Sequence, residues 1–413
     1  MTVKPGFKQT EIGAIPEDWQ TTKVGDVCGC IVPGRNKPKF FDGDIPWITT
    51  PDLENGKPVT TSRAGLCVSR AEAKSVGSKV VPPGAVLMSC AGELGIVALT
   101  HNEIVVNQQL HVFIPTERIL GTYLLSALAF QKDQIESSGT KTAVPYLNKN
   151  GCNSIAIPLP PLPEQRAIAA ALSDADEWIA SLDRLIAKKR DIKQAAMQQL
   201  LTGKTRLPGF SVEWDEVRLG QLFSFKNGLN KAKQFFGYGT PIVNYMDVFK
   251  SPVVRFSSLE GRVSLTAAEL NNFDVRKGDV FFTRTSETAE EVGIASVMLD
   301  EALNTVFSGF VLRARPLDHR LNHAFKAYCF SSPIVRKQIT SKASYTTRAL
   351  TNGKILSEVL LPLPPTFEEQ AVIAAALSDM DAELAALKAQ REKARSMKQG
   401  MMQELLTGRI RLI

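Results

Sequence analysis

The chain has 413 residues, 44% of them hydrophobic, and a formal net charge of +7, which favours two or three globular domains and an anionic partner such as nucleic acid or a membrane surface. No apolar stretch approaches the roughly 18–20 residues of a transmembrane helix, and the segment Met1–Trp19 lacks the apolar core of a signal peptide. The six scattered cysteines indicate reduced thiols and a cytoplasmic location rather than a disulfide framework.

The first region of the chain has the pattern of mixed α and β structure. Short apolar runs broken by Gly and Pro predict strands at 80–81, 85–88, 96–99 and 110–114, and a longer apolar run predicts a helix at 119–129.

A long helix is predicted next. The Pro-rich segment Pro158–Pro161 marks its start, because proline cannot continue a helix. Glu164 suits the positive end of the helix dipole, and Gly203 is a natural stop. About 38 residues at 1.5 Å each make a rod of about 55–60 Å.

A second mixed region follows, with strands predicted at 280–282 and 310–312 and a helix at 322–329. It repeats the first region faintly: Trp19 and Gly25 match Trp214 and Gly220. The second region ends at another Pro-rich segment, Pro362–Pro365.

The long helix then returns. Glu164 to Gly203 matches Glu369 to Gly408 without a gap, 205 residues later. The chain is therefore organised as domain, helix, domain, helix, with predicted limits at 1–157, 158–205, 206–361 and 362–413.

Both long helices carry apolar residues at the 4-3 spacing of a coiled-coil seam. The seam residues are Ile168, Leu172, Ala175, Ile179, Leu182 and Ile186 in the first copy, and Ile373, Leu377, Met380, Leu384 and Leu387 in the second. Two matching seams in one chain favour pairing as an antiparallel coiled coil; the alternative is that each stripe packs on its own domain. The heptad pattern is interrupted in the later part of each helix, at Leu185, Ile192 and Arg391. The prediction that the two helices pair is therefore weaker there.

This arrangement resembles the specificity subunits of Type I restriction-modification systems over essentially the whole chain. The residues that carry the resemblance are Pro-Leu-Pro-Pro-Leu-Pro-Glu-Gln at 158–165, Leu-Leu-Thr-Gly-Lys-Thr-Arg-Leu-Pro-Gly-Phe at 200–210, the second copies at 362–365, 369–370 and 405–408, and the opening segment 12–19. The second copy departs at 366–368, which is one residue longer than its counterpart.

The resemblance implies a fold of the α+β class and a non-catalytic function. Each of two target-recognition domains would read one half of a bipartite, asymmetric site in double-stranded DNA, and the paired helices would set a gap of about 5–8 base pairs between the halves. The helices would also dock two methyltransferase subunits that carry S-adenosylmethionine and methylate adenine at N6. Restriction subunits that use ATP and Mg would complete the assembly, and this chain itself would hold no cofactor or metal.

Three pairs of segments are candidates for DNA contact. Two basic runs are suited to phosphate neutralisation: Arg35, Lys37 and Lys39, and Lys226, Lys231 and Lys233. A loop containing Ser89 aligns with Arg284, Thr285 and Ser286, which are suited to reading base edges. Polar stretches with Lys141 and Thr142, and with Tyr345 and Arg348, form the third pair. The alternatives are a solvated loop for the runs and a plain hairpin turn for the Ser89 loop.

The sequence argues against chemistry in the chain itself. A carboxylate–lysine pattern of nucleases at Asp52, Glu72 and Lys74 is not repeated fully, since Asn271 stands opposite the lysine. The pair His319 and His323 lacks further zinc ligands nearby. The Asn-Pro-Pro-aromatic tetrad of adenine methyltransferases does not occur. The remaining alternatives to sequence-specific binding are a coiled-coil scaffold without sequence readout and, with less support, a metal-dependent nuclease.

Overall fold

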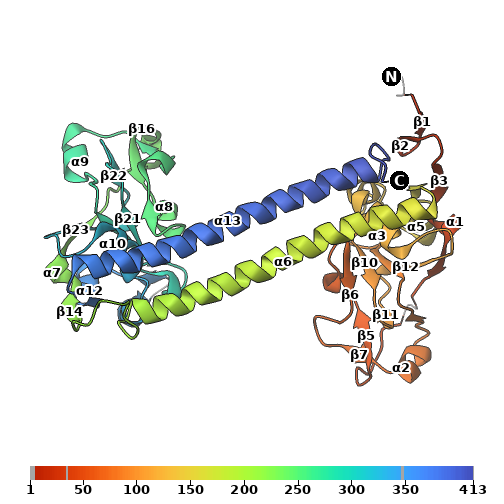
Figure 1. Ribbon diagram of the computed structural model, residues 1–413, viewed down its shortest axis with the longest axis horizontal. Helices are drawn as coiled ribbons and strands as arrows, with labels where there is room; N and C mark the ends of the chain where they lie inside the picture. Colours follow the sequence, from red (N-terminus) through yellow and green to blue (C-terminus); the bar gives the residue numbers. More distant parts are fainter. Residues whose placement is uncertain (1–4, 34–35, 346–347, 413) are drawn as a thin grey trace. The chain divides into compact units, whose positions relative to one another are not determined.

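A five-stranded sheet forms the centre of the first half of the computed structural model, which describes residues 5–33, 36–345 and 348–412 (Figure 1). Its strands, in spatial order, are β4 (Cys28–Ile31), β12 (Leu110–Pro115), β9 (Val86–Ser89), β10 (Val97–Thr100) and β6 (Lys57–Val59). Alternate residues of β9 face opposite sides, so Val86 and Met88 join one apolar cluster and Leu87 joins another. This sheet is therefore covered on both faces.

A second sheet and several helices complete this half. The sheet contains β7 (Cys67–Val68), β5 (Ile45–Ile48), β11 (Ile104–Val106) and β8 (Val80–Val81), with β5 and β11 parallel. The helices are α1 (Val24–Val27), α2 (Arg70–Ser75), α3 (Gly121–Phe130), α4 (Lys132–Ser137) and α5 (Lys149–Asn153). Tyr123 and Leu124 of α3 pack against Val86 and Val97 of the five-stranded sheet. The predicted strands and helix of this region are confirmed.

The second half repeats this scheme. Its five-stranded sheet has the order β15 (Phe223–Asn227), β23 (Val311–Pro316), β19 (Val280–Thr283), β21 (Ala295–Met298) and β17 (Val253–Val254). A smaller sheet contains β18 (Arg262–Val263), β16 (Phe236–Val243) and β22 (Val306–Phe307), with β16 and β22 parallel. The helices are α7 (Leu219–Leu222), α8 (Tyr245–Phe249), α9 (Ala267–Asn272), α10 (His323–Cys329), α11 (Pro333–Lys342) and α12 (Gly353–Ser357). The predicted repeat and α+β class are confirmed.

Two short strand pairs lead into the long helices. Strand β13 (Ala156–Leu159) pairs with β3 (Gln20–Lys23), and β26 (Leu360–Leu363) pairs with β14 (Asp215–Arg218). The predicted domain limits at 157/158 and 361/362 fall inside β13 and β26, so both Pro-rich segments begin as edge strands of a domain.

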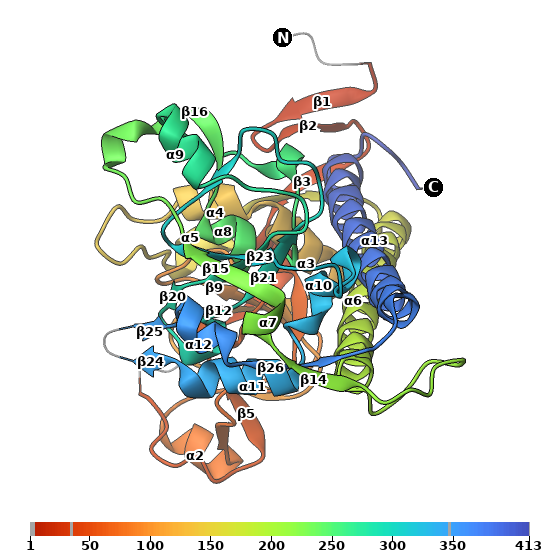
Figure 2. The same cartoon turned by 90° about the vertical axis from the view of Figure 1, so that its left-hand side faces the viewer.

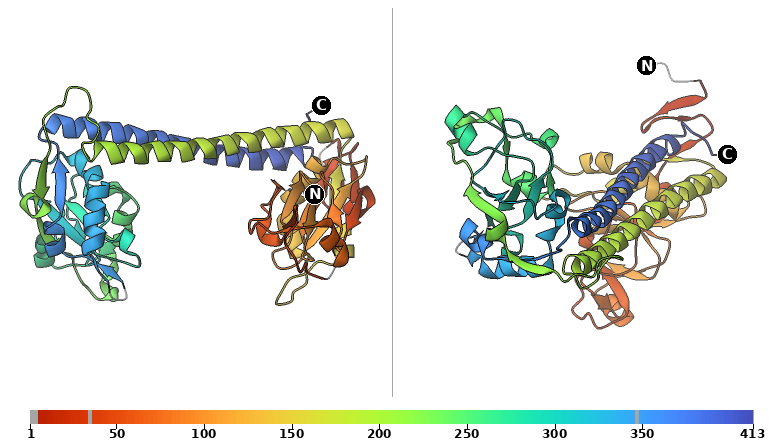
Figure 3. Two further views of the ribbon diagram at one scale, coloured as in Figure 1. Left: turned by 90° about the horizontal axis from the view of Figure 1, so that it is seen from below. Right: turned by 60° about the vertical axis from the view of Figure 1, so that its left-hand side comes forward.

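The long helices are α6 (Leu162–Leu200) and α13 (Phe367–Leu405), each 39 residues long. The chain divides into two units, Met1–Asp183 with Ala389–Ile413 (unit 1) and Arg184–Lys388 (unit 2), and each unit contains part of both helices. In unit 1 the beginning of α6 lies beside the end of α13, and in unit 2 the end of α6 lies beside the beginning of α13 (Figure 3). The helices are therefore antiparallel, as predicted.

Ion pairs join the two helices in each unit. Lys398 pairs with Asp176 in unit 1, and its repeat counterpart Lys193 pairs with Asp381 in unit 2. Arg391, which departs from the heptad, pairs with Asp183 instead of entering the seam. Opposite charges at equivalent levels of both helices favour the antiparallel register.

The seam residues differ in what buries them. In unit 1, Ile168 and Leu172 pack both with the domain and with Leu405 at the end of α13. Unit 2 repeats this with Ile373 and Leu377. The two packing alternatives thus apply together at the beginning of each helix. Of the remaining seam residues, Leu182, Ile186 and Leu384 are buried, and Ala175, Ile179, Met380 and Leu387 are half-buried. Leu185 and Ile192, outside the heptad, are exposed.

The cysteines and the apolar content of the helices can be compared with the sequence-based expectations. All six cysteines are free thiols, and four of them are buried. Among the described residues, no helix is long and apolar enough to cross a membrane.

Candidate nucleic-acid interface

Two of the predicted DNA-contacting segments are brought together by backbone pairing. In unit 2, β20 (Thr285–Ser286) pairs with β25 (Ala349–Leu350), which pairs with β24 (Ser344–Tyr345) (Figure 2). In unit 1 a bridge between Ala91 and Tyr146 joins the corresponding segments. The fold thus places a loop after the central strand beside a loop near the end of each domain, although these segments lie more than fifty residues apart.

A further segment, which the sequence analysis did not identify, lies next to these loops. It comprises residues 107–109 in unit 1 and 308–310 in unit 2, and it links the smaller sheet to β12 in unit 1 and to β23 in unit 2. The backbone N–H of Cys90 donates to the Gln109 carbonyl at 2.8 Å, and that of Arg284 donates to the Phe310 carbonyl at 3.1 Å. This crossover segment is therefore held against the Ser89 loop in unit 1 and against its counterpart in unit 2.

In unit 2 the two paired loops, the crossover segment and helix α8 line a cavity of about 410 Å³. Its lining residues are Tyr245, Phe249, Thr285, Ser286, Glu287, Glu291, Phe310 and Arg348. The rings of Tyr245 and Phe249 are stacked, with centroids 5.6 Å apart, and the Phe310 side chain is 64% exposed. Exposed aromatic faces beside an arginine are suited to contact with bases.

Unit 1 has a smaller cavity of about 180 Å³ at its own crossover segment. It is lined by Asn36, Lys37, Trp47, Val106, Asn107, Gln108 and Gln109. The Lys37 ammonium lies 5.6 Å from the Trp47 ring centroid and 5.9 Å from that of Phe41, so cation–π attraction holds it at this cavity. The first basic run and the crossover segment thus share one surface.

Four of the predicted contact residues have internal roles that correct the prediction. Ser89 is fully buried and its Oγ accepts the Ile96 N–H, and Ser286 is buried and donates to Glu291. Lys226 donates to the Asn272 backbone carbonyl at 2.6 Å. Lys231 forms a partly buried ion pair with Glu269 at 2.7 Å. These lysines hold α9 in place, and each ammonium group already has two hydrogen-bond acceptors within unit 2.

The other predicted contact residues present surface. Lys37, Lys39, Lys141, Thr142, Lys233, Tyr345 and Arg348 are exposed, and Arg284 and Thr285 are half-buried. Arg35 lies outside the described residues. In unit 1 the position of Arg284 is taken by Cys90, a buried thiol whose Sγ donates to the Gln109 carbonyl at 3.3 Å. These residues remain predicted DNA contacts.

The carboxylates of the nuclease-like pattern hold turns. Asp52 accepts the backbone N–H groups of Thr49 and Arg63, each at 2.7 Å. Asp247 accepts the Asn244 N–H at 2.8 Å, and burial raises its pKa. Among the described residues, no group of three or more His, Cys, Asp and Glu side chains is placed to hold a metal ion. Asp52 and Asp247 stand at matching positions of the two domains, and both stabilise a turn there.

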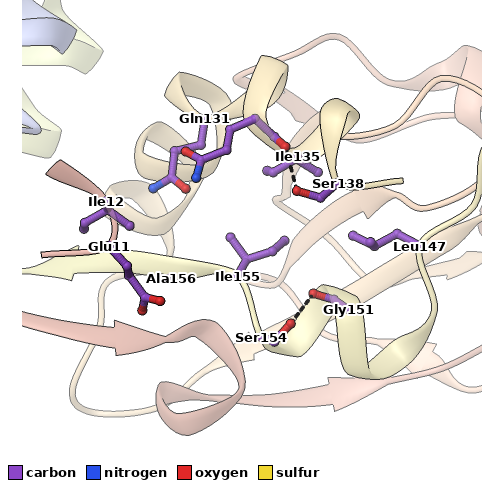
Figure 4. Close-up of a pocket in the computed structure, with 11 residues that line it drawn as sticks. Glu11, Ile12, Gln131, Ile135, Ser138, Leu147, Gly151, Ser154, Ile155 and Ala156 are labelled. Carbon is purple, nitrogen blue, oxygen red and sulfur yellow. Dashed lines mark hydrogen bonds between the residues drawn. The ribbon is translucent and has the colours of Figure 1, made fainter. Parts of the chain in front are cut away.

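Another hollow in unit 1, of about 300 Å³, has a different character (Figure 4). Its lining includes Ile12, Ile135 and Ile155, and Glu11 is the one charged residue among those that line it. The hydroxyl of Ser138 donates to the Gln134 carbonyl at 2.8 Å within the same segment. The lining contains no predicted contact residue and no residue of the crossover segment, so this hollow is not part of the candidate interface.

Comparison with known proteins assigns the family. The pattern of the family described as Type I restriction modification DNA specificity domain matches residues 16–188 and 211–394. The Type I restriction enzyme MjaIX specificity subunit of Methanocaldococcus jannaschii is 23% identical, covering 70% of this chain and 71% of its own. The MjaVIII specificity subunit of the same organism is also 23% identical, covering 98% of this chain and 96% of its own.

A solved structure shares the fold. The Type I restriction-modification S subunit from M. genitalium superimposes with a TM-score of 0.56 at 14% identity, covering 98% of each chain. Two matches to the family pattern cover most of the sequence, and they fall on the two repeated domains and their helices. The chain therefore belongs to the family of Type I restriction-modification DNA specificity proteins.

Proposed function

We propose that each unit reads one half of a bipartite, asymmetric site in double-stranded DNA. The observation that carries this proposal is the duplicated interface: the same backbone framework occurs twice, but its exposed side chains differ. Gln109 corresponds to Phe310, and Val144 corresponds to Arg348. Two different sets of side chains on one framework would recognise two different half-sites.

The paired helices would set the gap between the half-sites and dock two methyltransferase subunits. Large apolar side chains on both helices support docking, since they are exposed in this chain. They are Trp178, Leu185, Ile192, Val372 and Met397. Exposed apolar residues on a helical surface are typical of partner interfaces. The partners would supply S-adenosylmethionine and transfer methyl groups to adenine N6, and restriction subunits using ATP and Mg would join them; this chain would act without catalysis.

The test is a map of adenine N6 methylation in cells that carry the partner methyltransferase, with and without this chain. We expect a gapped, asymmetric motif that disappears when the chain is absent. A methylation pattern that does not change would contradict the proposal.

Docking is tested separately by co-purification of methyltransferase subunits with the full chain. Trp178→Ala and Met397→Ala are expected to weaken it. Leu317→Ala serves as the control, because Leu317 is 59% exposed but lies outside the long helices. Partner binding without any DNA sequence preference would favour the scaffold alternative.

A further inference from the structure

The crossover segments of the two units have the same backbone hydrogen bonds. In unit 1 the Asn107 N–H donates to the Ile48 carbonyl at 3.0 Å, and the Leu110 N–H donates back to Asn107 at 3.2 Å. In unit 2 the Ser308 N–H donates to the Val243 carbonyl at 2.9 Å, and Val311 donates to Ser308 at 3.1 Å. Gln109 and Phe310 therefore occupy the same position in the two units.

This position combines a fixed backbone with an exposed side chain. Leu110 and Val311, the next residues, are fully buried at the start of β12 and β23. Gln109 and Phe310 themselves are exposed, the latter by 64%. Side chains that project from a rigid element are placed more accurately than those on free loops. The position is thus suited to reading a base edge, and the two units differ there in chemistry.

In unit 1 the Gln109 amide is oriented by its neighbours. Its Oε1 accepts from Asn107 Nδ2 at 3.1 Å and from Thr50 Oγ1 at 3.5 Å, and the backbone N–H of Gln109 donates to Asn107 Oδ1 at 3.2 Å. Among the described residues, none accepts a hydrogen bond from its Nε2. The amide therefore offers a free, oriented Nε2 donor, and its oxygen would exchange the long contact with Thr50 for a hydrogen bond from a base. A donor and an acceptor side by side form the pattern that pairs with adenine N7 and N6 in the major groove.

In unit 2 the same position presents a hydrocarbon ring. Phe310 lines the cavity together with the stacked rings of Tyr245 and Phe249. A ring at this place has no hydrogen bond to offer a base edge, but it attracts the 5-methyl group of thymine. The neighbouring rings of Tyr245 and Phe249 would add apolar contact around this methyl group.

We propose that Gln109 selects adenine at one position of the first half-site and that Phe310 selects thymine at one position of the second through its methyl group. This inference rests on the proposed function, since it assigns a base preference to each of the two reading units. It makes residues 109 and 310 the equivalent specificity-determining position of the two units.

The experiment uses the full chain with its methyltransferase partner and DNA carrying the mapped motif. Replacing the selected adenine with 7-deazaadenine removes the N7 acceptor, and we expect a loss of wild-type affinity of about 5- to 100-fold. The Gln109→Ala variant should bind both DNAs equally. Replacing the selected thymine with uracil removes one methyl group, which should cost the wild type about fourfold and the Phe310→Ala variant nothing.

A change of preference gives a second readout. Gln109→Glu keeps the shape but replaces the donor with an acceptor, so the selected base should shift from adenine toward cytosine in the first half-site alone. The controls are Gln9→Ala and Leu303→Ala, which alter exposed side chains in unit 1 and unit 2 away from the crossover segments. Neither should change the motif.

The outcomes separate the two proposals. If the wild type shows no bipartite motif, the proposed function fails. If the motif is present but Gln109 and Phe310 variants keep the full base preference at every position, the function stands and this inference is overturned. Because both side chains are exposed, thermal unfolding of the variants should match the wild type, so that a folding defect is recognised.

Discussion

A single residue of α10 shows how the two units diverge inside a shared framework. Lys326 in unit 2 occupies the position of Leu124 in unit 1, as the matching hydrogen bonds of Gln370 and Gln165 to the preceding segments indicate. Its side chain is 2% exposed, and its ammonium group donates to the Gly278 carbonyl at 3.3 Å. Burial lowers the pKa of Lys326 to about 8, against a weaker opposing effect of Asp279.

This buried amine predicts an unusual dependence of stability on pH. Below pH 8 the amine is protonated in the folded and unfolded states, so the full cost of burying the charge is present. Between pH 8 and about 10.5 the folded state loses the proton while the unfolded chain keeps it, and the free energy of unfolding rises. Lys326→Leu should therefore stabilise unit 2 by about 2–3 kcal/mol at pH 7, and this advantage should shrink as the pH rises.

Chemical denaturation of wild type and Lys326→Leu between pH 7 and 10 measures the difference. Lys337→Leu is the matched control, because Lys337 is exposed on α11, and its difference from wild type should not vary over this range. A Lys326→Leu protein that is less stable than the wild type at every pH would show that the hydrogen bond to Gly278 outweighs the cost of the buried charge.

At the scale of elements, each long helix begins at a buried glutamate that is held from elsewhere in the chain. Glu164, with a fully buried side chain, accepts from Trp19 Nε1 at 2.9 Å and from Arg411 Nη2 at 2.7 Å. Glu369 accepts from Arg206 Nη2 at 2.8 Å and from Trp214 Nε1 at 3.3 Å. Each arginine follows the other long helix, so this cluster ties the end of one helix to the beginning of the other within a unit.

Removing the arginine should leave a buried carboxylate without its charge partner. We expect Arg411→Met to lower the free energy of unfolding of unit 1 by about 3–5 kcal/mol, and to increase hydrogen exchange at the start of α6. Arg206→Met should have the same effect at the start of α13 in unit 2.

The control is Arg409→Met, which removes a more exposed pair with Glu404 and should cost less than about 1 kcal/mol. Adding Glu164→Gln to Arg411→Met should recover part of the lost stability, since the amide carries no charge to compensate. An Arg411→Met protein as stable as the Arg409→Met control would show that the cluster does not stabilise the helix ends.

Elements that depend on local patterns could be predicted from the sequence, and those that depend on distant partners could not. The six predicted strands, α3, α10 and the two long helices follow from apolar runs, heptads and proline boundaries. The crossover segment was missed because a short polar or aromatic link between two apolar strands has no periodicity of its own. The sequence predicts a DNA contact at Lys231 because a lysine in a loop is usually solvated, but its ion-pair partner Glu269 lies 38 residues away in the chain.

At the scale of the whole molecule, affinity and specificity are expected to reside in different side chains. The net charge of +7 favours any DNA, because released counterions supply binding energy regardless of sequence. The crossover position, by contrast, bears uncharged side chains in both units. The duplicated fold would thus combine a general electrostatic attraction with two separate sequence readers.

This separation can be measured from the salt dependence of binding. Each of Lys37→Ala, Lys141→Ala and Lys233→Ala should weaken binding to specific and unrelated DNA by a similar factor, and each should reduce the slope of log K against log salt by about 0.9. The methylated motif should stay the same, because phosphate contacts carry no base information. Lys226→Ala and Lys231→Ala are the matched controls: their ammonium groups are already bonded within unit 2, so the salt slope should not change. Equal slopes for all five variants would place the phosphate contacts elsewhere, and a motif that changes in Lys37→Ala would show that this lysine reads a base.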